Sequence, residues 1–140
     1  MFENILLAVD GSEHALHAAR VASNLANAMN SQTLMILIVY EPIPVHLGEP
    51  YMQDAINARL NETEQIIQKA VQTLGTVSAA IQTESIEGDP AEVILDVAKI
   101  RNINVIVMGS RGLGKLAGLL LGSTSQKVVS HAPCPVLIVR

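Results

Sequence analysis

The sequence predicts an α/β fold: a single doubly wound parallel sheet of five strands with helices on both of its faces. Strand-sized apolar runs alternate along the chain with segments whose apolar residues recur at helical spacing. The first runs carry no polar residue, which is typical of strands that are covered on both faces. A chain of 140 residues is also of the size of one domain, so residues 1–140 are expected to form a single unit.

The first two strands are predicted at residues 5–9 and 34–40, which are apolar throughout. A turn at Asp10 and Gly11 separates the first strand from a helix that begins after Ser12, a typical N-cap residue. The apolar face of this helix is predicted from residues at helical spacing: Leu16, Ala19, Ala22, Ala26 and Met29.

Residues 41–53 interrupt the pattern with three prolines and a glycine. They form either a lid over a ligand or a variable connector, and the connector is the favoured interpretation. A second amphipathic helix follows and ends at Gly75, with its apolar stripe predicted at Ile56, Leu60, Ile67, Val71 and Leu74.

The third strand is predicted at residues 79–87, where polar and apolar residues alternate as in a half-exposed edge strand. Asp89 and Pro90 are then the N-cap and the first residue of a helix. Its buried stripe is predicted to contain Val93, Ile94 and Val97. Residues 136–139 form the last strand.

A glycine-rich segment connects the fourth strand, residues 105–108, to the last helix. Ser123 and Gln126 have the spacing of a capping box, which places the start of that helix at Ser123. The connection is then about 14 residues long, where strand-to-helix loops usually take about 2 to 6. Its glycines stand at positions 109, 112, 114, 118 and 122. A loop of this length and composition indicates that its backbone wraps around a ligand.

An anion is the predicted ligand, because free N–H groups and the helix dipole favour phosphate at a helix N-terminus. Gly122 lets the backbone approach, and the hydroxyls of residues 123–125 add donors. Gly109 and Gly112 are expected to adopt positive φ and to aim N–H groups into one concavity. The alternative is a surface loop that binds nothing.

Two well-known phosphate motifs nearly match this segment and both fail. Residues 109–115 satisfy G-x-x-x-x-G-K, but Leu116 stands where a magnesium-binding hydroxyl is required. Residues 112–117 satisfy G-x-G-x-x-A, but a dinucleotide site needs an acidic residue about 20 positions later. No Asp or Glu follows Asp96, so this interpretation is excluded as well.

The spacing of Gly109, Gly112 and Gly122-Ser123 gives the pattern G-x2-G-x9-G-[S/T], which resembles the nucleotide-binding branch of the universal stress protein family. Residues 7–12 and 133–139 resemble the same family, so the similarity spans the chain. The resemblance implies a flavodoxin-like, adenine nucleotide alpha hydrolase-like sheet of order 3-2-1-4-5. It further implies ATP bound with Mg²⁺ or Mn²⁺, a homodimer and a role in stress physiology.

In that strand order the topological switch lies between strands 1 and 4, and ligands bind beyond the carboxyl ends of such strands. Asp10 is expected to bond a nucleoside group or a metal-bound water, or only to stabilise its turn. The resemblance implies that the backbone of Val39 meets adenine. Arg111 pairs with phosphate or is merely solvated. The predicted nucleotide-binding residues are Ala8, Val9, Asp10, Val39, Met108, Gly109, Arg111, Gly112, Gly122, Ser123, Thr124 and Ser125.

Composition narrows the class of protein. The net charge is −4, yet residues 99–140 carry six cations and no acid, which gives the half with the glycine loop a positive field. Aromatic residues make up 2%, so a nucleic-acid surface is not expected. A lone Cys134 excludes an internal disulfide and is predicted to fill a small apolar space. Without a membrane-length apolar run or a signal-peptide pattern, a cytoplasmic location is expected.

The sequence therefore predicts an ATP-binding regulator whose bound nucleotide switches its conformation or its partner binding. No catalytic residue and no direct metal ligand are predicted, since the phosphates would hold the metal. A slow ATP hydrolase or phosphotransferase is the main alternative, and a partner-binding dimer with an unused nucleotide site is the other. The edge strand Val136–Val139 is the expected homodimer contact, because an exposed strand edge invites pairing with another chain.

Overall fold

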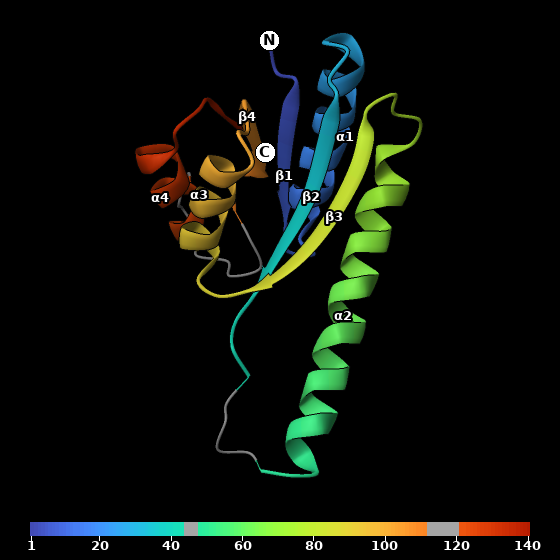
Figure 1. Ribbon diagram of the computed structural model, residues 1–140, viewed down its shortest axis with the longest axis vertical. Helices are drawn as coiled ribbons and strands as arrows, with labels where there is room; N and C mark the ends of the chain where they lie inside the picture. Colours follow the sequence, from blue (N-terminus) through green and yellow to red (C-terminus); the bar gives the residue numbers. More distant parts are fainter. Residues whose placement is uncertain (44–47, 112–120) are drawn as a thin grey trace.

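Strands and helices alternate along the chain in the computed structural model, which describes residues 1–43, 48–111 and 121–140 (Figure 1). In chain order the elements are β1 (Asn4–Val9), α1 (Glu13–Ala28), β2 (Thr33–Tyr40), α2 (Tyr51–Leu74), β3 (Ala80–Glu87), α3 (Pro90–Ile100), β4 (Val105–Gly109), α4 (Ser123–His131) and β5 (Val136–Val139).

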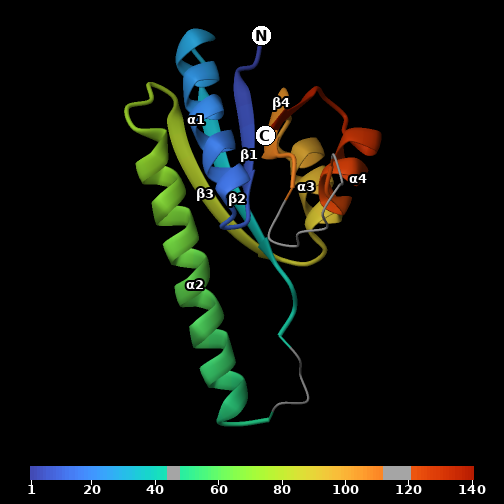
Figure 2. The same cartoon turned by 180° about the vertical axis from the view of Figure 1, so that it is seen from behind.

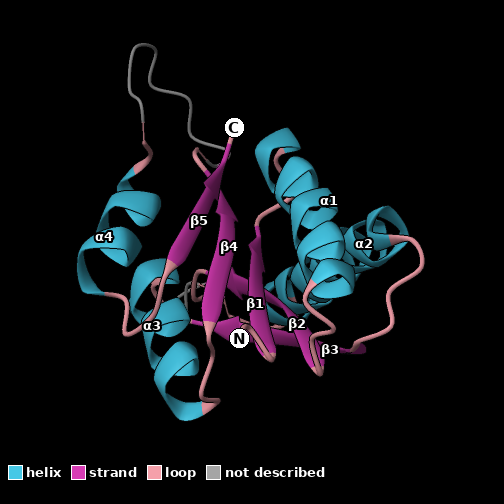
Figure 3. Ribbon diagram, turned by 90° about the horizontal axis from the view of Figure 1, so that it is seen from above, coloured by secondary structure: helices cyan, strands magenta, loops and turns pink. Residues whose placement is uncertain are grey.

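The strands form one parallel sheet of order β3-β2-β1-β4-β5, which confirms the predicted fold class and strand order. Seen from above, α1 and α2 cover one face of the sheet, and α3 and α4 cover the other (Figure 3). The order reverses between β1, the central strand of the sheet, and β4 beside it. β3 and β5 are its edges.

The core is divided into two layers by the pleat of the sheet, because successive side chains of a strand point to opposite faces. Ile5 and Leu7 of β1 pack on the side of α1 and α2, whereas Leu6 and Ala8 pack on the side of α3 and α4. Both sets are buried. The apolar runs in the sequence therefore reflect burial on two faces.

Helix α1 packs on the sheet through alanines and not through the predicted larger residues. Its buried stripe consists of Ala15, Ala18, Ala19, Ala22, Ser23 and Ala26. Leu16 is only half-buried and Met29, just past the helix, is 38% exposed. Small side chains bring the helix axis close to the sheet, and this close approach leaves the flanking larger residues outside the contact.

Helix α2 begins earlier than its predicted apolar stripe and extends well past the carboxyl ends of the strands (Figures 1 and 2). Its buried residues start only at Thr63, and Leu60, predicted on the buried stripe, is 53% exposed. Periodicity alone does not show where a helix leaves its sheet. Of the preceding segment, residues 44–47 lie outside the described part of the chain, so the choice between a lid and a connector stays open.

The predicted helix starts at Ser12 and Asp89 are confirmed. The Ser12 hydroxyl accepts a hydrogen bond from the Ala15 N–H at 3.2 Å, and the Asp89 carboxylate accepts one from the Glu92 N–H at 3.1 Å. Pro90 occupies the first turn of α3. Of the predicted stripe of α3, Ile94 and Val97 are buried with Ala91 and Ala98, whereas Val93 is half-buried.

Candidate functional site

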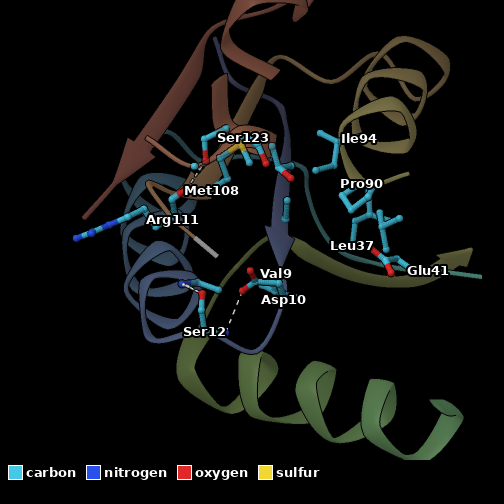
Figure 4. A pocket seen from close by; sticks show the side chains of 17 residues that line it. Val9, Asp10, Ser12, Leu37, Glu41, Pro90, Ile94, Met108, Arg111 and Ser123 are labelled. Carbon is cyan, nitrogen blue, oxygen red and sulfur yellow. Dashed lines mark hydrogen bonds between the residues drawn. The ribbon is translucent and has the colours of Figure 1, made fainter. Parts of the chain in front are cut away.

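A cavity of about 370 Å³ opens at the carboxyl ends of β1, β2 and β4, where the strand order reverses. Pockets for small ligands usually measure about 300 to 1,000 Å³, so the cavity is large enough for one. Its walls come from the ends of these strands, from the start of α1, and from the N-termini of α3 and α4 (Figure 4). The switch-point rule places a ligand at this end of such a sheet.

The cavity brings together eleven of the twelve residues predicted from the sequence, and the twelfth, Gly112, lies outside the described residues. The eleven are Ala8, Val9, Asp10, Val39, Met108, Gly109, Arg111, Gly122, Ser123, Thr124 and Ser125. Residues separated by about 100 positions in the chain thus share one wall. Their assembly is a geometric fact, whereas their contact with a nucleotide remains a prediction.

Six lining residues were not predicted: Ser12, Ala15, Leu37, Glu41, Pro90 and Ile94. Leu37 belongs to the same core layer as Ala8, Met108 and Ile94, so an apolar wall forms where α3 covers the sheet. The alternation of side chains along β2 could have identified Leu37, since it lies two residues before Val39 on the same face. No pattern in the sequence points to Pro90, because its contact depends on how α3 docks.

The N-terminus of α4 forms the polar end of the cavity. Its N-cap is Gly122, with φ −72° and ψ 167°, and within residues 1–43, 48–111 and 121–140 no side chain caps the helix. The predicted capping box at Ser123 is therefore wrong: Ser123 already belongs to the helix, and the extended residue before it has no side chain. The first turn of a helix leaves its N–H groups without intrahelical partners. Those of residues 123–125 stand beside the cavity.

Two hydrogen bonds tie together the ends of the loop between β4 and α4. The Gly122 N–H donates to the Ser110 carbonyl at 2.8 Å, and the Ser125 hydroxyl donates to the Gly109 carbonyl at 2.9 Å. Ser125 is only 3% exposed. Its hydroxyl is thus engaged within the protein, and the hydroxyls of Ser123 and Thr124 are the ones that remain for a ligand.

Gly109 is required by packing and not by the positive φ that the sequence suggested, since it is absent from the glycines with positive φ among the described residues. A Cβ at this position would lie 2.7 Å from the Cβ of His14 and 2.9 Å from its backbone carbon. The start of α1 therefore passes directly over the end of β4. The neighbouring Ser110 hydroxyl and the His14 Nδ1 are 3.2 Å apart, a contact that the sequence did not reveal.

Asp10 stabilises its own turn, which was the structural alternative for this residue. Its Oδ1 accepts a hydrogen bond from the Ser12 N–H at 2.9 Å, while Gly11 takes φ +89° (Figure 4). This Asx-turn leaves the second carboxylate oxygen without a role in the turn. Asp10 lines the cavity and thereby combines a structural role with a position beside any bound ligand.

The carbonyl of Val39 points past the last residue of β1. The Tyr40 carbonyl accepts from the Gly88 N–H at 2.9 Å and therefore faces β3. Because carbonyls alternate in direction along a strand, that of Val39 faces the side of β1. The pairing of β1 with β2 ends at Val9 and Ile38. This carbonyl is thus directed towards the cavity as an acceptor.

The side chain of Arg111 extends away from the other lining residues (Figure 4). A contact between its guanidinium and a phosphate would require a different rotamer. Within residues 1–43, 48–111 and 121–140 there is no group of three or more His, Cys, Asp or Glu side chains that could hold a metal ion. In the same residues no helix is both long and apolar enough to cross a membrane.

Comparison with known proteins gives a consistent result over the whole chain. The model of the universal stress protein family matches residues 1–140. A universal stress protein of Thermus aquaticus is 46% identical over 140 residues, which cover all of both chains. The structure of universal stress protein UspA from Lactobacillus plantarum superposes with a TM-score of 0.87 at 31% identity, covering 99% of this chain and 98% of that one.

Two more distant structures share the fold and were solved with an adenine nucleotide. A universal stress protein in complex with cAMP has a TM-score of 0.70 at 23% identity and covers 99% of this chain and 97% of its own. An Arabidopsis thaliana protein of the family with AMP bound has a TM-score of 0.69 at 20% identity, with coverages of 97% and 90%.

Proposed function

This chain belongs to the universal stress protein family, and we propose that it is a regulatory protein that binds ATP, with Mg²⁺ or Mn²⁺, in the cavity beyond β1 and β4. One observation carries the proposal: Ser123 at the N-terminus of α4 and the apolar side chains of Leu37 and Ile94 lie at different sides of the same cavity (Figure 4). A nucleotide has the matching polarity, with an apolar base at one end and phosphates at the other.

At the apolar side, Leu37, Pro90 and Ile94 provide surfaces against which a base packs (Figure 4). The Val39 carbonyl offers one acceptor, which suits an exocyclic amino group. At the polar side, the free N–H groups of α4 and its dipole favour phosphate. The φ of Gly122 is −72°, which any residue can adopt, so backbone conformation does not explain the glycine. Close approach of a phosphate to the backbone does.

Two relatives of the same fold were solved with cAMP and with AMP, which supports an adenine nucleotide as the class of ligand. The triphosphate is our extension from this chain's own residues. The glycine pattern that resembles the ATP-binding branch of the family is complete, with Gly112 in the undescribed part of the loop. The metal would be held by the phosphates, with the free oxygen of Asp10 placed to contact one of its water molecules.

We propose binding with slow or no turnover. Phosphoryl transfer needs a group that orients the attacking water and positive charge on the transition state. The carboxylates that line the cavity are Asp10, which is engaged in its turn, and Glu41, which follows β2. The Arg111 guanidinium points away (Figure 4). A slow ATP hydrolase is the competing function.

The bound nucleotide would order the loop between β4 and α4 and so change a surface recognised by a protein partner. We further propose a cytoplasmic homodimer formed along β5. This strand is an edge of the sheet, and Leu137 at its centre is 38% exposed. Exposed strand edges of this kind pair readily with a second chain.

Native mass spectrometry of the purified protein with and without MgATP tests the proposal. We expect one nucleotide per chain, and loss of that species in Gly122→Val, because the added side chain blocks the approach to α4. Ser130→Val is the matched control, since it adds a branched residue at an exposed position near the other end of the same helix. ADP accumulating over many turnovers would favour the hydrolase instead. Wild-type protein that binds no nucleotide at any concentration would exclude both.

A further inference from the structure

The cavity has a second acidic residue, Glu41, at its apolar side. Glu41 follows the last residue of β2 and lies next to Leu37 and Pro90 (Figure 4). Ser123 and the N-terminus of α4 lie across the cavity from it in the same view. A carboxylate beside the phosphates would repel them, whereas at the base side it can take part in recognition.

The backbone of Glu41 is held in place by helix α2. Arg59 Nη1 donates a hydrogen bond to the Glu41 carbonyl at 2.7 Å. The same guanidinium lies over the ring of Tyr40, 6.0 Å from its centroid, within the range of a cation–π contact. Two contacts from one side chain therefore fix residues 40 and 41 where the chain leaves the sheet. The Glu41 side chain projects from an anchored backbone.

Ionised carboxylates and backbone carbonyls accept hydrogen bonds and donate none. The base side of the cavity thus presents two acceptors, the Glu41 carboxylate and the Val39 carbonyl, which come from residues two positions apart at the end of β2. An exocyclic amino group carries two hydrogens and satisfies such acceptors. A keto oxygen at the same position of the base is itself an acceptor, so its lone pairs face those of the Glu41 carboxylate and the Val39 carbonyl. No hydrogen bond forms between them, and binding is weaker.

We infer that Glu41 is a specificity-determining residue that selects a purine with an amino group at position 6 over one with a keto group, and that Arg59 positions it. This inference rests on the proposed nucleotide function and adds to it the means of base selection. Because Glu41 is exposed, water competes for its carboxylate. We therefore expect discrimination of about tenfold, the lower end of the range for hydrogen bonds to charged groups.

Isothermal titration calorimetry with MgATP and MgITP tests the inference, because adenine and hypoxanthine differ in the group at position 6. Wild-type protein should bind ATP about tenfold more tightly than ITP. In Glu41→Gln the amide can rotate to donate to the keto oxygen, so the ratio should fall to about threefold or less. Arg59→Gln should lower the ratio by a smaller factor, since it releases the anchored backbone.

Glu87→Gln is the matched control. Glu87 pairs with Tyr40 at the end of the neighbouring strand, is exposed, and does not line the cavity. The substitution Glu87→Gln removes the same charge from the same end of the sheet, so the ratio of ATP to ITP affinity of this variant should stay at the wild-type value. An unchanged ratio in Glu41→Gln, with tight ATP binding, would overturn the inference and leave the proposed function standing. Absence of binding by both nucleotides to wild-type protein would overturn both.

Discussion

Helices α1 and α3 begin differently from α4, although all three contribute their N-termini to the same cavity. The hydroxyl of Ser12 and the carboxylate of Asp89 cap α1 and α3, each accepting a hydrogen bond from a backbone N–H three residues later. Helix α4 has Gly122 at the equivalent place and no side-chain cap. The first two helix starts thus have a cap within the protein, whereas the third has none among the described residues, and we propose that its N–H groups serve a ligand.

This difference between the helix starts predicts that a cap residue contributes to stability at α1 and α3, whereas the start of α4 contributes to ligand binding. Relative to a glycine at the N-cap, a capping side chain is worth a few tenths of a kcal/mol to a helix, so its absence at α4 lowers the stability of the nucleotide-free protein slightly. Bound phosphate would supply the same hydrogen bonds and add the attraction of the helix dipole. We therefore expect a substitution at the start of α4 to change nucleotide affinity with little effect on the free energy of unfolding. Removing the cap of α3 should do the reverse.

The largest effect is expected for Gly122→Asp, which gives α4 the cap that the other helices have. The aspartate would accept from the first-turn N–H groups, so the free energy of unfolding should stay unchanged or rise by a few tenths of a kcal/mol. ATP affinity should fall about 100-fold, because the carboxylate occupies the anion site and repels phosphate. Calorimetric titration and urea denaturation measure the two quantities. Loss of stability together with unchanged ATP affinity would contradict the proposed role of α4.

A large effect on stability is expected for Gly109→Ala, at the other end of the same loop. The new methyl group would lie 2.7 Å from the Cβ of His14 and 2.9 Å from its backbone carbon. Such crowding forces α1 away from the sheet and costs about 1 to 3 kcal/mol in the free energy of unfolding.

Gly75→Ala provides the control for Gly109→Ala in urea denaturation. Gly75 has φ +66° and ψ −139°, a conformation used almost only by glycine, and open space around it, so about 1 to 3 kcal/mol of backbone strain without a steric contact is expected there. If Gly109→Ala leaves the free energy of unfolding within about 0.5 kcal/mol of the wild-type value, the close approach of α1 to β4 is not what requires a glycine. Gly109, like Gly122, would then have to be explained by the ligand.

A smaller effect is expected for Asp89→Ala, which removes the cap of α3. Asp89 is exposed and does not line the cavity. The free energy of unfolding should fall by about 1 kcal/mol, while ATP affinity changes by less than about twofold. This variant is the counterpart of Gly122→Asp in both measurements. A marked loss of ATP affinity would show that the start of α3 takes part in binding and would weaken the contrast between the helices.

The sequence was sufficient for those features that depend on local pattern. The apolar runs at residues 5–9 and 34–40 predicted the central strands because burial on both faces removes polar residues from a strand. Ser12 and Asp89 predicted two helix starts because the cap and its partner lie three residues apart. The spacing of the glycines indicated the resemblance to the family, and the resemblance implied the strand order. That order predicted that Asp10 and Gly109 lie at one site.

Features that depend on docking were not predicted. Leu60 follows the periodicity of α2 but lies in the first part of the helix, which extends past the carboxyl ends of the strands and is largely exposed. The capping-box pattern at Ser123 could not show that Gly122 is the N-cap, since both residues suit the position. The roles of Gly109 and Glu41 arise from contacts with His14 and Arg59, elsewhere in the chain. Such contacts carry no signal in the local sequence.

The smallest effect concerns Cys134, which follows the C-terminus of α4 and packs against the core beneath α3 and α4. Burial raises the pKa of the Cys134 thiol, while a backbone hydrogen bond to Ile106 opposes this shift. Only the thiolate reacts with disulfide reagents. Labelling should therefore be slower at pH 7 than for a free thiol and should accelerate as the pH rises towards the raised pKa.

If ATP acts only at the start of α4, saturating nucleotide should leave this rate unchanged at each pH. A labelling rate altered by ATP would mean that binding at the N-terminus of α4 moves the whole helix and thereby changes the access of the reagent to Cys134.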